Sequence, residues 1–234
     1  MELNTKIFAD GAELADIARL CKNPVIRGFT TNPTLMRKAG VTDYEQFARA
    51  AIELVGERPI SLEVFSDEFD DMERQARRIA TWGSKVYVKI PVTNTRREPA
   101  DALVQRLSEA GVKLNVTAIM TLDQVKRVAA RLANGVPGII SIFAGRIADT
   151  GVDPLPIMRS AVELVRPHPS IEIIWASPRE LLNVVQASDI GCHIITVTSD
   201  ILAKLELLGR DLGEYSLATV KMFHTDAVSA GFKL

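Results

Sequence analysis

The sequence predicts an α/β fold: a (β/α)₈ barrel, or TIM barrel, in which eight parallel strands alternate with helices. Three observations indicate this class. Apolar, strand-like runs recur eight times along the 234 residues, and each is followed by a segment with apolar residues at three- and four-residue spacing. Such alternation produces a parallel sheet. Because no linker or composition break divides the chain, a closed barrel is favoured over an open doubly wound sheet.

The predicted strands are short runs rich in apolar and β-branched residues. In chain order they are Lys6–Asp10, Val25–Thr31, Pro59–Phe65, Val86–Val92, Val112–Ile119, Gly138–Gly145, Ser170–Ser177 and His193–Thr198. The chain is slightly shorter than the roughly 250 residues typical of this fold, so its loops must be tight.

The helices between the strands are predicted from their period and their end signals. Clear amphipathic stretches are Asp43–Gly56, Glu68–Trp82 and Thr121–Asn134. Three residues stand where N-caps are expected: Asp43, Thr121 and Ser177. Glycines at positions 56, 83, 111 and 135 are expected to end helices.

The chain continues beyond the helix that would close the barrel. We expect residues 1–234 to form a single barrel domain, with 214–234 as a C-terminal helical extension. Within it, Tyr215–Ala230 has the pattern of an amphipathic helix. That helix can pack on the barrel or on a neighbouring subunit.

Composition excludes several classes of partner. The formal net charge is −1, with 28 basic and 29 acidic residues, so we expect no nucleic-acid partner. Cys21 and Cys192 are far apart and suit a reducing compartment better than a disulfide framework or a metal site. The N-terminus lacks the apolar core of a signal peptide, and no apolar stretch is long enough to span a bilayer. We therefore expect a cytoplasmic protein without a membrane partner.

Lys89 lies in Val86–Val92, a run that is otherwise apolar and largely β-branched. A strand buried on both faces reads as continuous apolar sequence, and an unpaired ammonium there is costly. Burial favours the neutral amine, which can condense with a ketone or aldehyde to form a Schiff base. Taken alone, a lysine in a strand is more often an edge-protecting charge or an ion-pair partner than a nucleophile.

Polar residues, with one aromatic, collect at the carboxyl ends of the predicted strands, where barrel active sites lie. In strand order they are Asp10; Thr30 and Asn32; Ser61 and Glu63; Lys89; Asn115 and Thr117; Ser141 and Phe143; and Ser177. Many are two residues apart and so share one face of their strand. Because barrel interiors normally hold Val, Ile and Leu, this ring predicts an active site.

Simpler explanations exist for single members of the ring. Asp10 precedes Gly11 and also fits a cap or turn residue, and Asn32 before Pro33 also fits a turn. Glu63 also fits a structural ion-pair partner of Lys89. One ion pair, however, accounts for two members of the ring and leaves the others unexplained.

Arg146 and Arg179 form a second candidate group, because each follows a late strand by a few residues. In barrels the loops after the late strands often bind phosphate, and guanidinium groups match phosphate geometry. Each arginine alone also fits a solvated surface position.

Two motifs resemble the transaldolase family. They are Phe29-Thr30-Thr31-Asn32-Pro33-Thr34 after the second strand and Val88-Lys89-Ile90-Pro91-Val92-Thr93 on the fourth. The resemblance covers essentially the full chain and is strongest to the small subfamily that includes fructose-6-phosphate aldolase. It implies an α/β barrel, no metal or cofactor, and Schiff-base chemistry on a ketose phosphate.

The resemblance also implies a role for each candidate residue. Lys89 resembles the nucleophile that attacks the ketose carbonyl, and Asp10 resembles the base that takes the C4 hydroxyl proton. Glu63 and Thr117 resemble the pair that holds a water and moves protons. The positions similar to donors and acceptors for the donor sugar's hydroxyls are Asn32, Asn115 and Ser177, while Thr30, Ser141 and Phe143 complete the expected substrate-binding set. Arg146 and Arg179 look like the phosphate clamp.

Two positions favour transfer over simple cleavage. In the aldolase branch a glutamine usually occupies position 63 and a tyrosine position 143, whereas Glu63 and Phe143 match the transaldolase branch. The expected reaction moves a dihydroxyacetone unit from sedoheptulose 7-phosphate or fructose 6-phosphate to an aldose phosphate, as in the pentose phosphate pathway. Three alternatives stay open: an aldolase that releases dihydroxyacetone, a transaldolase specialised for another sugar, and a barrel that binds phosphosugars without turnover. The resemblance further implies a homo-oligomer, a pentamer or decamer.

The sequence departs from the family at three positions: Gly11, Trp175 and Pro178. Gly11 removes a hydroxyl that usually follows the aspartate. Trp175, two residues before Ser177, is expected to share its face and narrow the pocket mouth, although core packing explains it equally well. These departures leave the acceptor sugar open.

Overall fold

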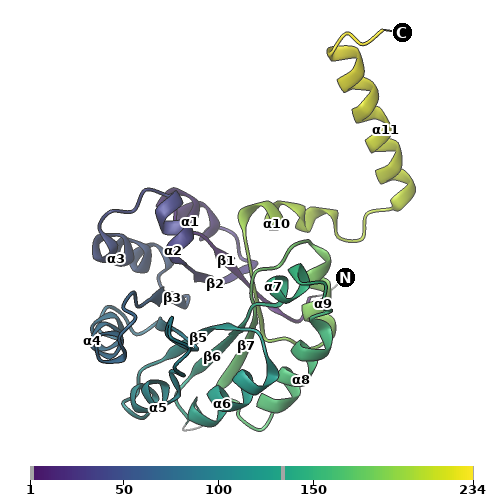
Figure 1. Cartoon of the computed structure of the whole chain (residues 1–234). Coiled ribbons are helices and arrows are strands. Elements are labelled where there is room, and N and C mark those ends of the chain that lie inside the picture. The colour runs from purple at the N-terminus through teal and green to yellow at the C-terminus, as the bar shows by residue number, and fades with distance from the viewer. Residues whose placement is uncertain (1–2, 133–134, 234) are drawn as a thin grey trace.

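Eight parallel strands pair in chain order and close into a barrel (Figure 1). The structure, a computed structural model, describes residues 3–132 and 135–233. The strands are β1 (Lys6–Asp10), β2 (Ile26–Thr30), β3 (Ile60–Glu63), β4 (Val86–Pro91), β5 (Leu114–Ile119), β6 (Gly138–Ile142), β7 (Ile171–Trp175) and β8 (Ile194–Val197). β1 pairs with both β2 and β8, which closes the sheet. The predicted barrel is confirmed.

Helices follow the strands, and all but the last of them cover the outside of the barrel (Figure 1). They are α1 (Leu14–Leu20), α2 (Pro33–Lys38), α3 (Tyr44–Val55), α4 (Phe69–Ala80), α5 (Asp101–Glu109), α6 (Leu122–Leu132), α7 (Ala144–Asp149), α8 (Leu155–Val165), α9 (Leu182–Asp189), α10 (Ser199–Ala203) with the 3₁₀ turn η1 (Lys204–Leu207), and α11 (Leu212–Ser229). Asn134, the predicted end of the helix that becomes α6, and Leu234, the end of the predicted extension, lie outside the described residues.

Two of the predicted N-caps are confirmed. The Asp43 carboxylate accepts a hydrogen bond from the Gln46 amide at 2.9 Å, and the Thr121 hydroxyl accepts one from the Gln124 amide at 3.3 Å. The prediction for Ser177 is wrong, because α9 begins five residues later. Ser177 instead has a φ of 56°, in the left-handed region, where β7 has already ended. The predicted strand Ser170–Ser177 is therefore too long at its carboxyl end.

The apolar core has two layers, one inside the barrel and one between the strands and the helices. The inner layer is small and consists of Phe8, Ile139, Ile174, Ala176 and Ile194. A Cβ at Gly28 would stand 2.5 Å from the Phe8 ring, so the missing side chain on β2 gives that ring its space. The inner layer forms a floor beneath the carboxyl ends of the strands.

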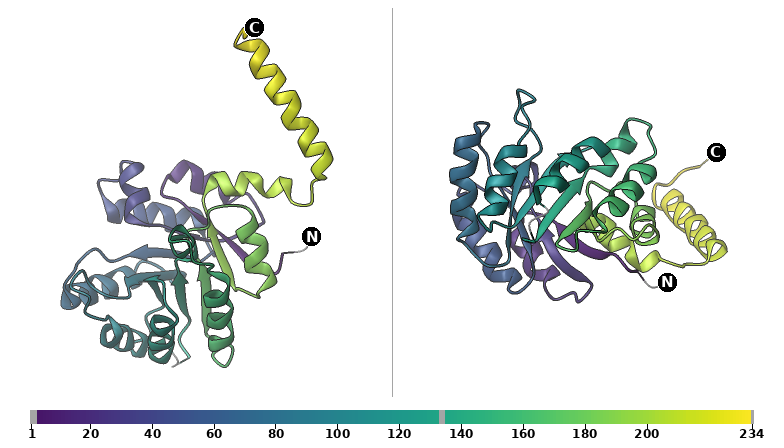
Figure 2. Two further views of the ribbon diagram at one scale, coloured as in Figure 1. Left: turned by 45° about the vertical axis from the view of Figure 1, so that its right-hand side comes forward. Right: turned by 90° about the horizontal axis from the view of Figure 1, so that it is seen from below.

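The C-terminal helix α11 stands away from the barrel (Figures 1 and 2). None of its residues is buried, and its exposed apolar side chains include Leu212, Val220, Met222 and Phe223. The predicted helix Tyr215–Ala230 is confirmed within a few residues. In the part of the chain that is described, no helix combines the length and the apolar character needed to cross a bilayer.

Candidate active site

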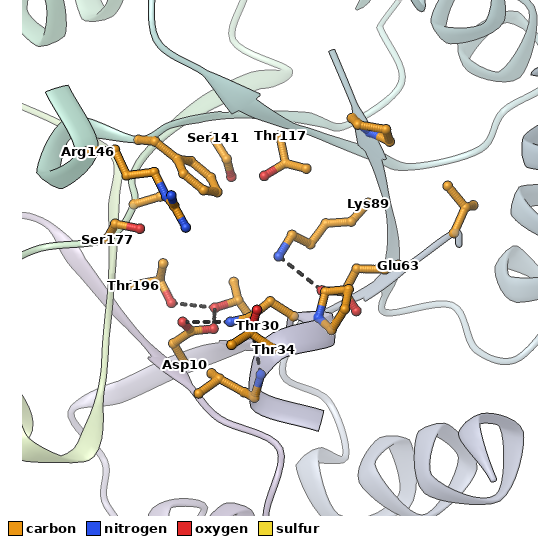
Figure 3. A pocket seen from close by; sticks show the side chains of 17 residues that line it. Asp10, Thr30, Thr34, Glu63, Lys89, Thr117, Ser141, Arg146, Ser177 and Thr196 are labelled. Carbon is orange, nitrogen blue, oxygen red and sulfur yellow. Dashed lines mark hydrogen bonds and ion pairs between the residues drawn. The ribbon is translucent and has the colours of Figure 1, made fainter. Parts of the chain in front are cut away.

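A pocket of about 430 Å³ opens at the carboxyl ends of the strands (Figure 3). Of the twelve predicted site residues, ten line it: Asp10, Thr30, Asn32, Glu63, Lys89, Thr117, Ser141, Phe143, Arg146 and Ser177. They come from seven strands or the loops that follow them, so the closed barrel brings together residues up to 167 positions apart, from Asp10 to Ser177. Asn115 and Arg179 lie outside this lining.

Lys89 projects from β4 into the pocket and is 8% exposed. Its Nζ donates to the Glu63 carboxylate at 3.0 Å and to the Thr31 backbone carbonyl at 2.5 Å. Residues 63 and 89 are direct partners in the pairing of β3 with β4, which holds the two side chains side by side. The amine is thus anchored at the floor of the pocket, within reach of a bound carbonyl group.

The Glu63 carboxylate has two hydrogen-bond partners and is almost fully buried, at 4% exposure. Its Oε1 accepts from Lys89, and its Oε2 accepts from the Thr31 hydroxyl at 2.9 Å. Burial raises the pKa of Glu63, while the nearby Lys89 and the Thr31 hydroxyl oppose that rise. A carboxylate with a raised pKa next to an amine can take a proton from that amine and give one back.

Asp10 ends β1, two strands from Glu63 on β3, with Thr30 of β2 between them (Figure 3). Its Oδ1 accepts from the Thr30 hydroxyl at 2.8 Å, and its Oδ2 accepts from the Asn32 side-chain amide at 3.3 Å. Burial raises the pKa of Asp10, and the charge of Lys89 is the largest effect that opposes the rise. The pocket therefore holds two carboxylates in different surroundings, an arrangement that allows two proton-transfer roles.

Asn32 takes the turn position that its sequence suggests and also lines the pocket. Its Oδ1 accepts from the Leu35 amide at 2.9 Å and so caps α2, while Pro33 occupies the first turn of that helix. The amide nitrogen of the same side chain points to Asp10. The cap therefore fixes the orientation in which Asn32 meets the pocket.

Asn115 lies beneath the pocket and is fully buried. Its amide nitrogen donates to the Ser61 hydroxyl at 2.9 Å, and its oxygen accepts from the Ser141 hydroxyl at 2.7 Å. Asn115 therefore holds Ser141 in place from below. By contrast, the buried Thr117 hydroxyl lines the pocket and has no hydrogen-bond partner among the described residues, which leaves it free to bind water or a sugar hydroxyl.

The two candidate phosphate ligands differ in position. Arg146, on α7, lines the pocket and stacks near the Phe143 ring, with its Cζ 5.7 Å from the ring centroid. Arg179 is about half exposed and forms a bidentate ion pair with Asp149, in which its Nε lies 2.8 Å from Oδ1. The two arginines are linked through Asp149, because both lower the pKa of its carboxyl, Arg179 most strongly.

Arg179 remains close to the loop that carries Arg146. A Cβ at Gly145 would stand 1.5 Å from the Ser177 carbonyl oxygen and 3.4 Å from the Arg179 guanidinium carbon. The loops after β6 and β7 thus touch backbone to backbone, a contact that only glycine permits at position 145. This contact places both arginines at one rim of the site.

Trp175 does not narrow the pocket mouth, so that expectation was wrong. Its side chain is 1% exposed and belongs to the layer between the strands and the helices. In a regular strand, residues 175 and 177 would share a face. They do not share one here, because the Ser177 backbone is in the left-handed region. At Gly11, another of the three departures, no atom of the described residues stands within 4 Å of the place where a Cβ would be.

Thr196 on β8 is one of the pocket residues that were not predicted from the sequence. It lines the pocket, is 6% exposed, and its Oγ1 lies 2.5 Å from the Thr30 Oγ1. Threonine is common in strands, so Thr196 gives no local signal. Its position two residues after Ile194, on the inner face of the last strand, was the available clue. Thr31, which orders Glu63, was quoted in the motif but given no role.

No group of three or more His, Cys, Asp or Glu side chains that could hold a metal ion occurs within residues 3–132 and 135–233.

Comparisons with known proteins find relatives over nearly the whole chain. The family model for transaldolase/fructose-6-phosphate aldolase matches residues 7–233. A probable transaldolase from Thermoanaerobacter sp. is 34% identical over 232 residues, which cover 98% of this chain and 100% of that protein. A probable transaldolase from Streptococcus agalactiae is 35% identical over 201 residues, covering 86% of this chain and 89% of that protein.

Solved structures show the same architecture at much lower identity. The crystal structure of a putative lyase/mutase from Burkholderia cenocepacia superposes with a TM-score of 0.60 at 14% identity, covering 95% of this chain and 84% of that one. This likeness supports the barrel and nothing further. The family match over residues 7–233 and the near full-length relatives carry more, and they confirm the enzyme class that the motifs predict. The chain belongs to the transaldolase/fructose-6-phosphate aldolase family.

Proposed function

We propose that this transaldolase moves a dihydroxyacetone unit from a ketose phosphate to an aldose phosphate through a Schiff base on Lys89. The observation that carries the proposal is the placement of the Lys89 amine. It is buried in the pocket, 3.0 Å from one carboxylate, in a cavity that also holds a second. A desolvated amine paired with a proton acceptor is a nucleophile for carbonyl carbon.

The first half of the reaction forms the imine. The neutral Lys89 nitrogen attacks the C2 carbonyl of the ketose, and the carbonyl oxygen leaves as water after it gains protons. Glu63, with its raised pKa, is placed to take the proton from the amine and return one to the leaving oxygen. The unpartnered Thr117 hydroxyl suits a hydrogen bond to that water.

The second half breaks the C3–C4 bond. Asp10 takes the C4 hydroxyl proton, the C4 oxygen becomes an aldehyde, and the electron pair of the broken bond moves into the iminium to give an enamine. The aldose phosphate leaves, an acceptor aldehyde enters, and the enamine carbon attacks it with the proton returned. The two carboxylates lie on different strands and have different hydrogen-bond partners, which suits them to separate proton transfers.

Phosphate binding is proposed for the rim that holds Arg146 and Arg179. Arg146 faces the pocket directly. Arg179 uses one edge of its guanidinium for Asp149, so its other edge remains available for a phosphate oxygen. Sedoheptulose 7-phosphate and fructose 6-phosphate are the proposed donors. The pentose phosphate pathway, in the cytoplasm, is the proposed setting.

A homo-oligomer is part of the same proposal, as a pentamer or decamer. α11 exposes Leu212, Val220, Met222 and Phe223 and has no buried residue of its own. An apolar surface of this kind on a helix that stands away from its barrel favours packing against another copy. Sedimentation velocity at several protein concentrations tests this part.

Borohydride reduction in the presence of fructose 6-phosphate tests the central claim. Reduction of the Schiff base fixes the three-carbon unit to the chain, and we expect a single adduct on the peptide that contains Lys89. The control is Lys89→Ala, which should give none. The absence of an adduct on the wild-type chain, or an adduct that survives in Lys89→Ala, contradicts the mechanism.

Cleavage that releases dihydroxyacetone is the second candidate function. Phe143 speaks against it, because a phenyl ring lines the pocket where a phenol could orient water to protonate the enamine. We expect Phe143→Tyr to increase dihydroxyacetone release without acceptor by roughly tenfold, the scale of one added proton donor. The wild-type chain is the control in a coupled assay for dihydroxyacetone. No gain in release would show that the ring does not decide between transfer and cleavage.

A further inference from the structure

We propose that Thr196 is a positioning residue for the base Asp10 and acts through Thr30. This inference rests on the proposed function, because it assigns Thr196 a part in the step that breaks the carbon–carbon bond. The three residues form one chain of hydrogen bonds across the place where the barrel closes (Figure 3).

The geometry joins three strands. Thr196 on β8 has its Oγ1 2.5 Å from the Thr30 Oγ1 on β2, and that oxygen lies 2.8 Å from Asp10 Oδ1 on β1. Because β1 pairs with both β2 and β8, the three side chains stand on neighbouring strands. Thr30 is 3% exposed and Thr196 is 6% exposed. Water therefore has little access to either hydroxyl.

The direction of each hydrogen bond follows from the number of protons. An ionised carboxylate only accepts, and a threonine hydroxyl has one proton to donate. Thr30 gives its proton to Asp10, so the proton between the two threonines belongs to Thr196. Thr196 thus fixes the Thr30 hydroxyl in the orientation that points at the carboxylate. Because the Thr30 oxygen accepts a hydrogen bond from Thr196, the hydrogen bond that Thr30 donates to Asp10 becomes stronger.

The chain of donors has two consequences for Asp10. It fixes the carboxylate by Oδ1, so that Oδ2, which has only the longer contact of 3.3 Å with Asn32, is the oxygen left for the sugar proton. It also stabilises the ionised form, which a base needs, against the rise in the pKa of Asp10 that burial causes. The charged groups that face Asp10 across the pocket are Lys89, Glu63 and Arg146. They stay in place when Thr196 is changed.

The experiment compares Thr196→Val, which keeps the shape and removes the donor, with Thr196→Ser, which keeps the donor. We expect Thr196→Val to lower kcat/KM for fructose 6-phosphate by roughly fivefold, the scale of one neutral hydrogen bond. The acidic limb of its kcat/KM profile should move to higher pH, because Asp10 loses support for its ionised form. The yield of borohydride adduct should stay at the wild-type level, and Thr196→Ser should recover both quantities.

Two further variants separate positioning from a structural effect. Thr5→Val removes a hydroxyl that is similarly buried, at 6% exposure, and that has no hydrogen-bond partner in the described part of the chain, so it should leave the pH profile unchanged. Thr30→Val and the double variant Thr30→Val/Thr196→Val should have the same activity, since Thr196 acts only through Thr30. This cycle remains readable even where Thr196→Val lowers the Tm.

Two results overturn the inference while the proposed function stands. One is a Thr196→Val profile that superimposes on the wild type in rate and pH. The other is a fold-loss of kcat/KM in the double variant that equals the product of the two single fold-losses, which assigns Thr196 a separate role. Failure of the wild-type chain to form the adduct at all is a different outcome, because it contradicts the Schiff base itself.

Discussion

Two lysine–glutamate pairs lie at opposite ends of the barrel, and only one of them has the features of a reactive site. At the carboxyl end, Lys89 and Glu63 are 3.0 Å apart, with side chains 9% and 5% exposed. At the amino end, Lys6 and Glu172 are closer, at 2.6 Å, but their side chains are 51% and 27% exposed. Both pairs have the same residue types and a direct ionic contact. The difference is water, which solvates the second pair and not the first.

Burial changes what a pair does. An ion pair in contact with water contributes about 0–1 kcal/mol to stability, and its charges remain fixed near neutral pH. A buried pair pays a desolvation cost that its attraction barely offsets, so that proton positions become sensitive to a bound substrate. A lysine therefore becomes a candidate nucleophile because its surroundings are buried, and not because its partner is a glutamate.

The strongest test exchanges each lysine for methionine, which keeps the chain length and removes the amine. We expect Lys89→Met to lower donor turnover by at least about 10⁴-fold, because the nucleophile of a covalent mechanism is lost. Lys6→Met should stay within about twofold of the wild type, since it removes only a solvated pair. Steady-state consumption of fructose 6-phosphate measures both. Equal losses in the two variants would contradict the distinction.

The second test exchanges each glutamate for glutamine. We expect Glu63→Gln to lower turnover roughly 10²- to 10³-fold, because a proton-transfer group is lost. The amide oxygen of the glutamine can still accept from Lys89, while its amide nitrogen can donate to the Thr31 hydroxyl, which then donates to the Ser61 carbonyl. Glu172→Gln is the matched control and should retain activity. Single-turnover formation of the borohydride adduct should be slowed in Glu63→Gln alone. A normal rate of adduct formation there would remove Glu63 from imine formation.

The smallest expected effect is a change in the free energy of unfolding. It concerns Asp10, a buried carboxylate that forms no ion pair within the described part of the chain. Because its pKa is raised above 3.8, the folded chain binds more protons than the unfolded chain between that pH and the raised value. Wild-type stability therefore falls as pH rises through this window, whereas Asp10→Asn does not titrate. We expect Asp10→Asn to be more stable at pH 7 by roughly 1 kcal/mol, at the expense of activity.

Urea unfolding at several pH values measures this difference, with the wild-type chain as the reference. The stability advantage of Asp10→Asn should shrink toward zero as pH falls below about 4, because Asp10 is then protonated in both the folded and the unfolded wild-type chain. A variant that is less stable than the wild type at pH 7 would show that the hydrogen bonds of Asp10 outweigh the cost of its burial.

Much of the fold and of the pocket was predictable because both depend on local patterns. Strand runs and helical periods depend on residues that are close together in the sequence. A polar residue such as Lys89 within an apolar strand can therefore be recognised from the sequence alone. The ends of the strands were less predictable, because polar and apolar residues continue the strand pattern after the backbone has turned. The left-handed conformation of Ser177 is the clearest case.

What the sequence could not indicate are contacts between side chains that are distant along the chain. The pairing of Arg179 with Asp149 spans 30 residues and depends on where two loops meet. The proposed role of Thr196 depends on its contact with Thr30, 166 residues earlier, which forms only when β8 pairs with β1. Asn115 has the expected residue type, but its partners Ser61 and Ser141 decide that it supports the pocket from below.

The backbone contact between Gly145 and Ser177 limits how this enzyme can be re-engineered. With a Cβ at position 145 only 1.5 Å from a carbonyl oxygen, any other residue there forces the two arginine-bearing loops apart. Mutant libraries that aim at new sugar chain lengths should therefore keep position 145 constant. They should place their diversity at Phe143, and at Gly11, where open space surrounds the missing side chain.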